Sequence, residues 1–284
     1  MRSFPALLAL AGALCSPAPL VSAEPPAPTV AADAPTYADL ASLADGAPLA
    51  VRVKVKDQAM VPAERAPGLA AGHARLYIEA RTLALLAGNA ALPESLRYLV
   101  DVPLDAKGKP PKLKKREFVL FARPVAARPG EVQLVSPRAQ LSYTAALEAR
   151  LRPVLTAVLA AGAPPRVTGV RDVLSSTGNL AGESETQIFL ATAHGEPAAL
   201  TVTRRPGRAP RWGVSWTELV DQAAQAPPRD TLAWYRLACA LPRTLPAGAH
   251  VATDPADRAR GAQDYRFVLD QLGPCERRLT GDPS

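Results

Sequence analysis

The chain has 284 residues, of which 33 are Lys or Arg and 26 are Asp or Glu, so its formal net charge is +7. Hydrophobic residues make up 48% of the chain, which is enough for a sizeable core in one large domain or two small ones. No segment reaches the roughly 20 consecutive apolar residues of a membrane-spanning helix, so the sequence excludes a membrane span.

The first 23 residues have the order of features of a cleavable bacterial-type signal peptide. Arg2 precedes the apolar run Phe4 to Leu14, and Val21 to Ala23 place small residues where a signal peptidase cleaves. Lipidation at Cys15 is the less favoured alternative, because a lipidated cysteine normally follows a small residue and here it follows leucine. Cleavage before Glu24 would remove one basic residue and no acidic one, leaving a net charge of +6. We therefore expect a soluble periplasmic or secreted protein.

The segment after the cleavage site, residues 24–35, is a Pro/Ala tract without an apolar period, typical of a flexible leader. A short helix is predicted from Tyr37 to Ala44. From Leu49 to Lys56 apolar and cationic residues alternate, which predicts a strand with one apolar face. Four further strands are predicted at Arg75 to Leu86, Leu96 to Val102, Glu117 to Arg123 and Glu131 to Val135.

Closely spaced strands with little helix between them predict an antiparallel sheet, because parallel strands need long crossovers. We expect residues 36–141 to form an antiparallel, β-barrel-like N-terminal domain. Its strand order resembles that of exported barrels of the oligonucleotide/oligosaccharide-binding (OB) or netrin type, and this likeness implies a fold but no function.

A helical period replaces the alternation from Thr144 to Ala161, with Thr144 as N-cap. Pro153 lies inside this segment, and an interior proline removes a hydrogen bond and costs about 3 kcal/mol. The sequence therefore predicts a kinked helical connector over residues 142–163.

Residues 164–284 are predicted to form a β-meander followed by helices, which makes the fold class α+β. The strands are expected at Glu185 to Ala193, Pro197 to Arg204 and Arg211 to Trp216. Helices are expected at Thr217 to Ala224, at Asp230 to Leu241 with Asp230 as N-cap, and between Asp254-Pro255 and Gly273-Pro274.

Two strings in this half, DTLAWYRLAC from Asp230 to Cys239 and RPGRAPRWG from Arg205 to Gly213, resemble an uncharacterised family of exported alphaproteobacterial proteins. The similarity covers most of the chain after the signal peptide. It implies no activity and no site residues, since none is known for that family.

After cleavage two cysteines remain, Cys239 and Cys275, an even pair delivered to an oxidising compartment. We expect them to form a disulfide. Free buried thiols are the alternative, and a metal site is less favoured because zinc usually needs four ligands at short spacings.

Few residues have the types and spacing of a catalytic site. We expect the three histidines in solvated loops: His73, His194 and His250. Ser184 lacks the final glycine of a nucleophile elbow. Glu183 and Glu185 are two residues apart and could act as the carboxylate pair of a glycosidase, although acids at a strand edge are more often solvated. No motif for a metal or nucleotide cofactor occurs.

Aromatic residues concentrate in the second half. Trp212 and Trp216 are four residues apart and could form a carbohydrate-stacking platform, but aromatics at this spacing more often belong to the core. Trp234 and Tyr235 are expected to pack beside Cys239.

The most unusual segment is KGKPPKLKKR, residues 107–116, which has six cations in ten residues. The cations are Lys107, Lys109, Lys112, Lys114, Lys115 and Arg116. No aromatic residue interrupts them, so base stacking is not provided and nucleic acid is not an expected partner. A solvated loop is one interpretation, and contact with an anionic envelope component is the other.

The sequence does not determine the function. The favoured hypothesis is a non-catalytic periplasmic or secreted protein that binds an envelope component without a cofactor. The alternative is a carboxylate-dependent hydrolase acting on envelope sugars. The oligomeric state is left open.

Overall fold

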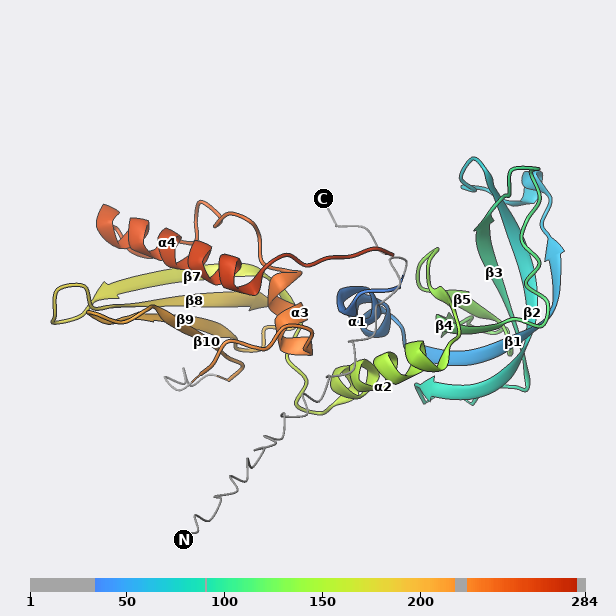
Figure 1. Ribbon diagram of the computed structural model, residues 1–284, viewed down its shortest axis with the longest axis horizontal. Coiled ribbons are helices and arrows are strands. Elements are labelled where there is room, and N and C mark those ends of the chain that lie inside the picture. Colours follow the sequence, from blue (N-terminus) through green and yellow to red (C-terminus); the bar gives the residue numbers. More distant parts are fainter. Residues whose placement is uncertain (1–33, 90, 218–223, 280–284) are drawn as a thin grey trace, which may run out of the picture. The chain divides into compact units, whose positions relative to one another are not determined.

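The computed structural model describes residues 34–89, 91–217 and 224–279. The predicted signal peptide, nearly all of the leader and most of the predicted helix 217–224 lie outside these residues. Contacts divide the chain into two units, residues 1–34 and residues 35–284, and the second unit contains all the helices and strands that the structure describes. This unit combines helices with two antiparallel sheets, which confirms the α+β class (Figure 1).

Helix α1 (Tyr37–Gly46) begins at a capping box. The Thr36 hydroxyl accepts a hydrogen bond from the Asp39 N–H at 3.1 Å, and the Asp39 carboxylate accepts one from the Thr36 N–H at 2.9 Å. The N–H groups of Thr36 and Asp39, for which the helix provides no carbonyl acceptor, thereby each gain a hydrogen-bond partner. The sequence predicted this helix but not its cap.

The first sheet contains β1 (Leu49–Met60), β2 (His73–Ala87), β3 (Ser95–Pro103), β4 (Glu117–Pro124), β5 (Val132–Leu134) and β6 (Gln140–Ser142). Its order is β3-β2-β1-β4-β5, and β6 also pairs with β4. The five predicted strands are confirmed, whereas β6 was not predicted. Three residues are too few for an apolar alternation to be recognised.

The first sheet is not a closed barrel, which corrects the barrel-like prediction. In the described residues β3 and β5 are joined by one isolated bridge, at which the Arg97 N–H donates to the Gly130 carbonyl at 2.8 Å. A side-chain hydrogen bond joins β3 to β6, from the Tyr98 hydroxyl to Gln140 Oε1 at 2.8 Å. Nothing in this arrangement confirms an OB or netrin type.

The alternating residues of the first sheet face two different hydrophobic clusters. Val51 and Val53 of β1 and Leu120 of β4 face an interior cluster enclosed by the sheet. Val119 and Phe121, on the opposite face of β4, belong to a second cluster that includes helices and the other sheet, here called the shared core. Strand β4 is therefore buried on both faces.

Helix α2 (Ala145–Leu159) is one uninterrupted helix that contains Pro153. Thr144 caps it as predicted, accepting from the Leu147 N–H at 3.0 Å. Pro153 lies on the exposed face, where the carbonyl of Ala149, left without its helical donor, can bind water. The apolar face, with Leu151 fully buried, enters the shared core.

The second sheet has four strands in the order β10-β9-β8-β7, one more than predicted. They are β7 (Val167–Thr177), β8 (Ser184–Thr192), β9 (Ala199–Arg204) and β10 (Arg211–Ser215). Strand β7 escaped prediction because two register shifts space its buried residues Val167, Val170 and Val173 three apart. When the buried residues of a strand recur every three positions, the sequence lacks the alternation of period two by which a strand is recognised.

Two helices complete the unit. Helix α3 (Leu232–Ala238) is shorter than predicted and is capped by Thr231, because Asp230 has φ 58° and cannot serve as the extended N-cap. Helix α4 (Pro255–Leu272) has the predicted Asp254 cap and ends at Gly273. None of the described helices is long and apolar enough to cross a membrane.

Helix α4 is fixed to the second sheet by a buried carboxylate. Asp264 has no solvent exposure and accepts hydrogen bonds from the Arg204 guanidinium at 2.7 Å and from the Thr186 hydroxyl. A buried charge is tolerated only with such partners, so this group sets where α4 packs.

Candidate functional site

The predicted lysine-rich segment is the connection between β3 and β4, here called the lysine loop (residues 104–116). Its first turn is organised by Asp105, whose Oδ1 accepts from the N–H groups of Lys107 at 2.9 Å and Lys109 at 2.8 Å. Gly108 completes the turn with φ 70°, a left-handed conformation that costs glycine little. The backbone is therefore bent by a local side chain.

The rest of the lysine loop is held against β1. The Gln58 side chain donates to the Pro111 carbonyl at 3.0 Å and accepts from the Leu113 N–H. Leu113 is 2% exposed and belongs to the interior cluster of the first sheet. The Lys115 N–H donates to the Val55 carbonyl at 2.9 Å, which extends the pairing of β4 with β1. One buried leucine and three hydrogen bonds thus fix this half of the loop.

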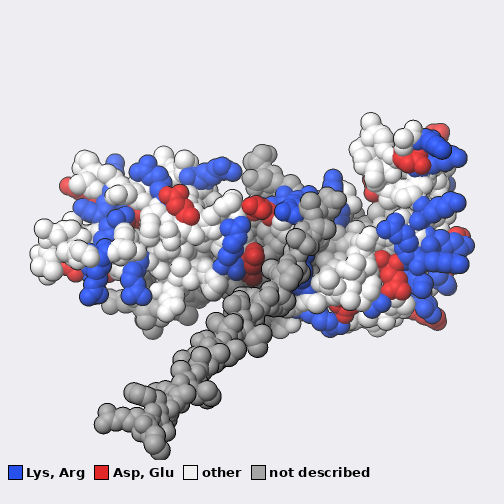
Figure 2. All heavy atoms as spheres, viewed as in Figure 1, with Lys and Arg blue, Asp and Glu red and all other residues white. Residues whose placement is uncertain are grey.

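The side chains that carry the loop's positive charge are all exposed: Lys107, Lys109, Lys112, Lys114, Lys115 and Arg116. Lys114 is 3.5 Å from Asp57, and Arg116 donates to the Ser142 hydroxyl at 3.3 Å. The other four have no salt bridge to any described residue. An exposed ion pair such as Lys114 with Asp57 contributes little to the stability of the fold, so most of the loop's positive charge remains available to a partner. Figure 2 shows Lys and Arg side chains gathered over the region that contains β1 and β2.

A second charged group lies on the outer face of β1. Arg52 donates to Glu117 at 2.7 Å, approaches Glu148 at 3.7 Å, and places its guanidinium carbon 3.5 Å from the ring centroid of Tyr143. The hydrogen bond from Arg52 lowers the pKa of Glu117, and the hydrogen bond from Arg152 lowers the pKa of Glu148. Contacts with arginine thus favour the ionised form of both carboxylates, whereas the proton donor of a glycosidase has a raised pKa.

The two acids proposed from the sequence, Glu183 and Glu185, lie at the start of β8. The Glu183 N–H donates to the Leu180 carbonyl at 3.0 Å, and Glu185 accepts from the Gln187 side chain at 2.9 Å. Ser184 between them is 7% exposed and lies within the sheet. Both acids are partly buried where the interior strand β8 begins, and Ser184 is not presented as a nucleophile.

The histidines do not come together. His73 contacts the Ala71 carbonyl at 3.1 Å, His194 lies in the β8–β9 hairpin, and the backbone of His250 forms a bridge with Val173 of β7. Within residues 34–89, 91–217 and 224–279, no group of three or more His, Cys, Asp or Glu side chains is placed to hold a metal ion.

The tryptophans belong to the core, as the sequence favoured, and do not form a stacking platform. Trp212 is 9% exposed, and Trp216 packs partly buried against the shared core. Trp234 is 3% exposed and donates from its indole nitrogen to the Leu272 carbonyl at 2.8 Å. Tyr37 meets Trp234 edge-on at 6.4 Å, and burial raises the pKa of this tyrosine to about 12.

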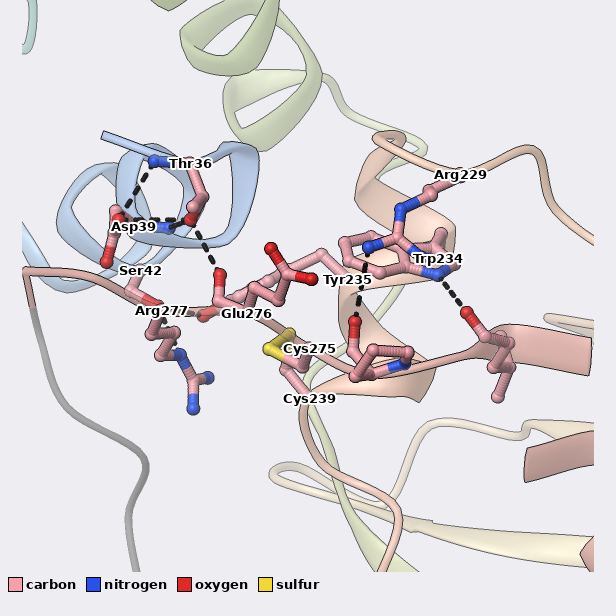
Figure 3. The surroundings of a disulfide bond; sticks show 12 residues. Thr36, Asp39, Ser42, Arg229, Trp234, Tyr235, Cys239, Cys275, Glu276 and Arg277 are labelled. Carbon is pink, nitrogen blue, oxygen red and sulfur yellow. Dashed lines mark hydrogen bonds between the residues drawn. A yellow bond between two sulfur atoms is a disulfide. The ribbon is translucent and has the colours of Figure 1, made fainter. Parts of the chain in front are cut away.

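The expected disulfide is present between Cys239, at the end of α3, and Cys275, with the two sulfur atoms 2.01 Å apart (Figure 3). Cys275 lies in the stretch that follows α4, here called the C-terminal segment (residues 273–279). Arg229 also holds this segment, donating to the Pro274 carbonyl at 3.4 Å.

The same segment is bound to α1 through Asp39. The Asp39 carboxylate accepts from the N–H groups of Arg278 at 3.1 Å and Leu279 at 2.9 Å, and the Thr36 hydroxyl donates to the Glu276 carbonyl at 2.7 Å. Burial of Asp39 would by itself raise its pKa, but these hydrogen bonds outweigh burial and lower it. Figure 3 shows that the cap of α1 and the disulfide meet the C-terminal segment at neighbouring residues.

A pocket of about 430 Å³ lies at the other end of the first sheet, between the β2–β3 and β4–β5 connections. Its floor includes Leu96 and Val132 of the interior cluster, and prolines form much of its wall. Arg128 and Glu131 line it and are 3.4 Å apart. The charges neutralise each other, so this pocket has no evident preference for a charged ligand.

Sequence reasoning found the cations of the lysine loop but missed the residues that fix it. Gln58 lies about 50 positions from its partners, and no local pattern relates them. Asp105 was more accessible to prediction, since Asp followed by Gly three residues later is typical of a turn.

Comparison with known proteins does not add a function. No protein-family model matches this chain, and no curated protein is significantly similar to it. The resemblance to exported alphaproteobacterial proteins therefore stays a prediction.

Proposed function

We propose that this is a non-catalytic periplasmic or secreted protein that binds an anionic component of the cell envelope through the lysine loop. The observation that carries the proposal is the contrast between the loop's backbone and its side chains. Asp105, Gln58 and Leu113 hold the backbone, whereas the six cations are exposed.

A fixed loop favours binding because little conformational entropy is lost when a ligand arrives. Lysines that already had strong partners would have to break those contacts first. Lys107, Lys109 and Lys112 have no salt bridge to any residue that the structure describes, so their charges are free to meet an anion.

Two further observations agree with the proposed location and chemistry. The Cys239–Cys275 pair fits an oxidising compartment. Of the carboxylates suggested for sugar hydrolysis, Glu185 already accepts a hydrogen bond from Gln187, and hydrogen bonds from arginines lower the pKa of the two near Arg52. Binding therefore has better support than hydrolysis.

The test compares two variants that remove the same charge from different loops. The first is Lys107→Gln, Lys109→Gln and Lys112→Gln; the matched control is Arg205→Gln, Arg208→Gln and Arg211→Gln in the exposed β9–β10 hairpin. We expect the lysine variant to lose retention on isolated envelope material at low salt, and the arginine variant to keep most of it.

Salt provides a second readout. The Debye length falls from roughly 10 Å at 0.1 M to about 3 Å at 1 M, so retention of the unmodified protein should fall steeply over this range. Equal retention of the two triple variants would show that overall charge, and not the lysine loop, causes binding.

A further inference from the structure

The lysine loop shares its end of the first sheet with a second, mainly apolar connection. Residues 61–72 join β1 to β2, and the Leu104 N–H donates to the Gly72 carbonyl at 2.8 Å. Gln58, near the end of β1, holds the other side of the lysine loop at Pro111. We call the surface formed by residues 60–72 and 104–116 the basic tip.

The apolar part of the basic tip is unusually exposed. Met60, the last residue of β1, is 63% exposed, although methionine is normally found in cores or at binding surfaces. The residues that follow it include further exposed apolar side chains: Pro62, Ala63, Pro67, Ala70 and Ala71. This connection contains one acid, Glu64, and one cation, Arg65, so it carries no net charge.

Cations beside exposed apolar side chains are the combination that a bilayer surface selects. Anionic headgroups attract lysines, and apolar side chains enter the boundary between headgroups and acyl chains. A soluble anionic polymer would interact with the lysines alone and gives no role to Met60. We infer that the basic tip is a docking surface for a phospholipid bilayer with anionic headgroups.

This inference rests on the proposed function and specifies its partner. The protein would lie on the bilayer without spanning it. Gln58 and Asp105 hold the lysine loop in place through hydrogen bonds, and Gln58 lies two residues before Met60 in β1, so charge and apolar contact can act together. Each lysine that comes close to an anionic surface strengthens binding about fivefold.

The experiment measures co-sedimentation of the protein, as isolated from cells, with vesicles of phosphatidylcholine alone or mixed with phosphatidylglycerol. Dextran sulfate serves as the soluble polyanion in a parallel binding assay. The variants are Met60→Gln, the triple Gln variant of Lys107, Lys109 and Lys112, and the control at Arg205, Arg208 and Arg211. Thermal unfolding checks that each variant is folded.

We expect binding to the mixed vesicles and none to phosphatidylcholine alone. The triple lysine variant should bind the mixed vesicles about 100-fold more weakly. Met60→Gln should weaken vesicle binding about fivefold or more and leave dextran sulfate binding unchanged, because only the bilayer offers an apolar phase.

Other outcomes separate the inference from the proposed function. If dextran sulfate binds and mixed vesicles do not, or if Met60→Gln has no effect on vesicle binding, the bilayer is the wrong partner and an anionic polymer remains. If the triple lysine variant behaves like its arginine control with both ligands, the proposed function fails as well.

Discussion

The two sheets bury their apolar faces in different ways. The first sheet encloses an interior cluster formed by its own strands and by Leu113 of the lysine loop. The second sheet has one apolar face in the shared core, to which α1, α2, α3, α4 and Phe121 of β4 contribute. The first sheet therefore largely supplies its own core, whereas the second depends on helices from both halves of the chain.

The difference explains where charge can accumulate. The outer face of the first sheet is left for solvent where the shared core does not cover it, and the cations of β1 lie there. The second sheet depends on helices, and specific contacts hold these helices in position. Asp264 holds α4 against the sheet, and the C-terminal segment is bonded to the end of α3.

The largest effect should come from the shared core. Phe121→Ala removes a fully buried side chain and should lower the free energy of unfolding by about 3–5 kcal/mol, because it leaves a cavity. Its neighbour Leu120 is equally buried but faces the interior cluster, so Leu120→Ala is the matched control. Amide hydrogen exchange should rise in β8 for Phe121→Ala and mainly in β1 and β2 for Leu120→Ala. The same exchange pattern for both variants would contradict the division into two cores.

The disulfide should come next. Replacing both Cys239 and Cys275 with Ser should lower the free energy of unfolding by about 2–4 kcal/mol, since the unfolded chain is no longer constrained. Urea unfolding measures the change. Reduction of the unmodified protein should have a similar effect, and a double variant as stable as the oxidised protein would show that the bridge contributes nothing.

A smaller, pH-dependent effect is expected at Asp39. Its pKa is lowered in the folded protein, so its contribution to stability is complete above the unfolded pKa of 3.8 and is lost as the pH falls through the lower folded value. Asp39→Asn should destabilise the protein by about 1 kcal/mol at neutral pH, as loss of a cap does. The difference between the two proteins should shrink below about pH 4. A difference that is constant from pH 7 to pH 3 would exclude this role.

The smallest effect should be that of the lysine loop on folding. Replacing Lys107, Lys109, Lys112, Lys114 and Lys115 with Gln should change the free energy of unfolding by less than about 0.5 kcal/mol, because these side chains are exposed. Thermal unfolding checks this. Leu113→Ala, in the same loop, should be clearly destabilising because it removes a buried side chain. Equal stability of these two variants would show that Leu113 does not anchor the loop.

The sequence predicted those parts of the fold whose signals are local. The alternation from Leu49 and the caps at Thr144 and Asp254 placed elements correctly. Strand β7 was missed because its register shifts break the alternation.

The candidate site shows the same division. Its charges are contiguous in sequence and could be recognised at once. The groups that fix the loop could not be recognised, because they depend on contacts between residues that are distant in the sequence. The exposure of Met60 could not be predicted either, because it depends on which other residues pack beside the end of the strand.

The bond between Asp39 and Leu279 joins residues 240 positions apart. The bond between Thr36 and Glu276 has the same separation, and closing so large a loop costs conformational entropy before the contact can form. While the protein is being synthesised, α1 can form its capping box but cannot gain the partners that its buried carboxylate requires. Helix α1 therefore gains the last partners of its buried carboxylate only when the N–H groups of Arg278 and Leu279 reach it.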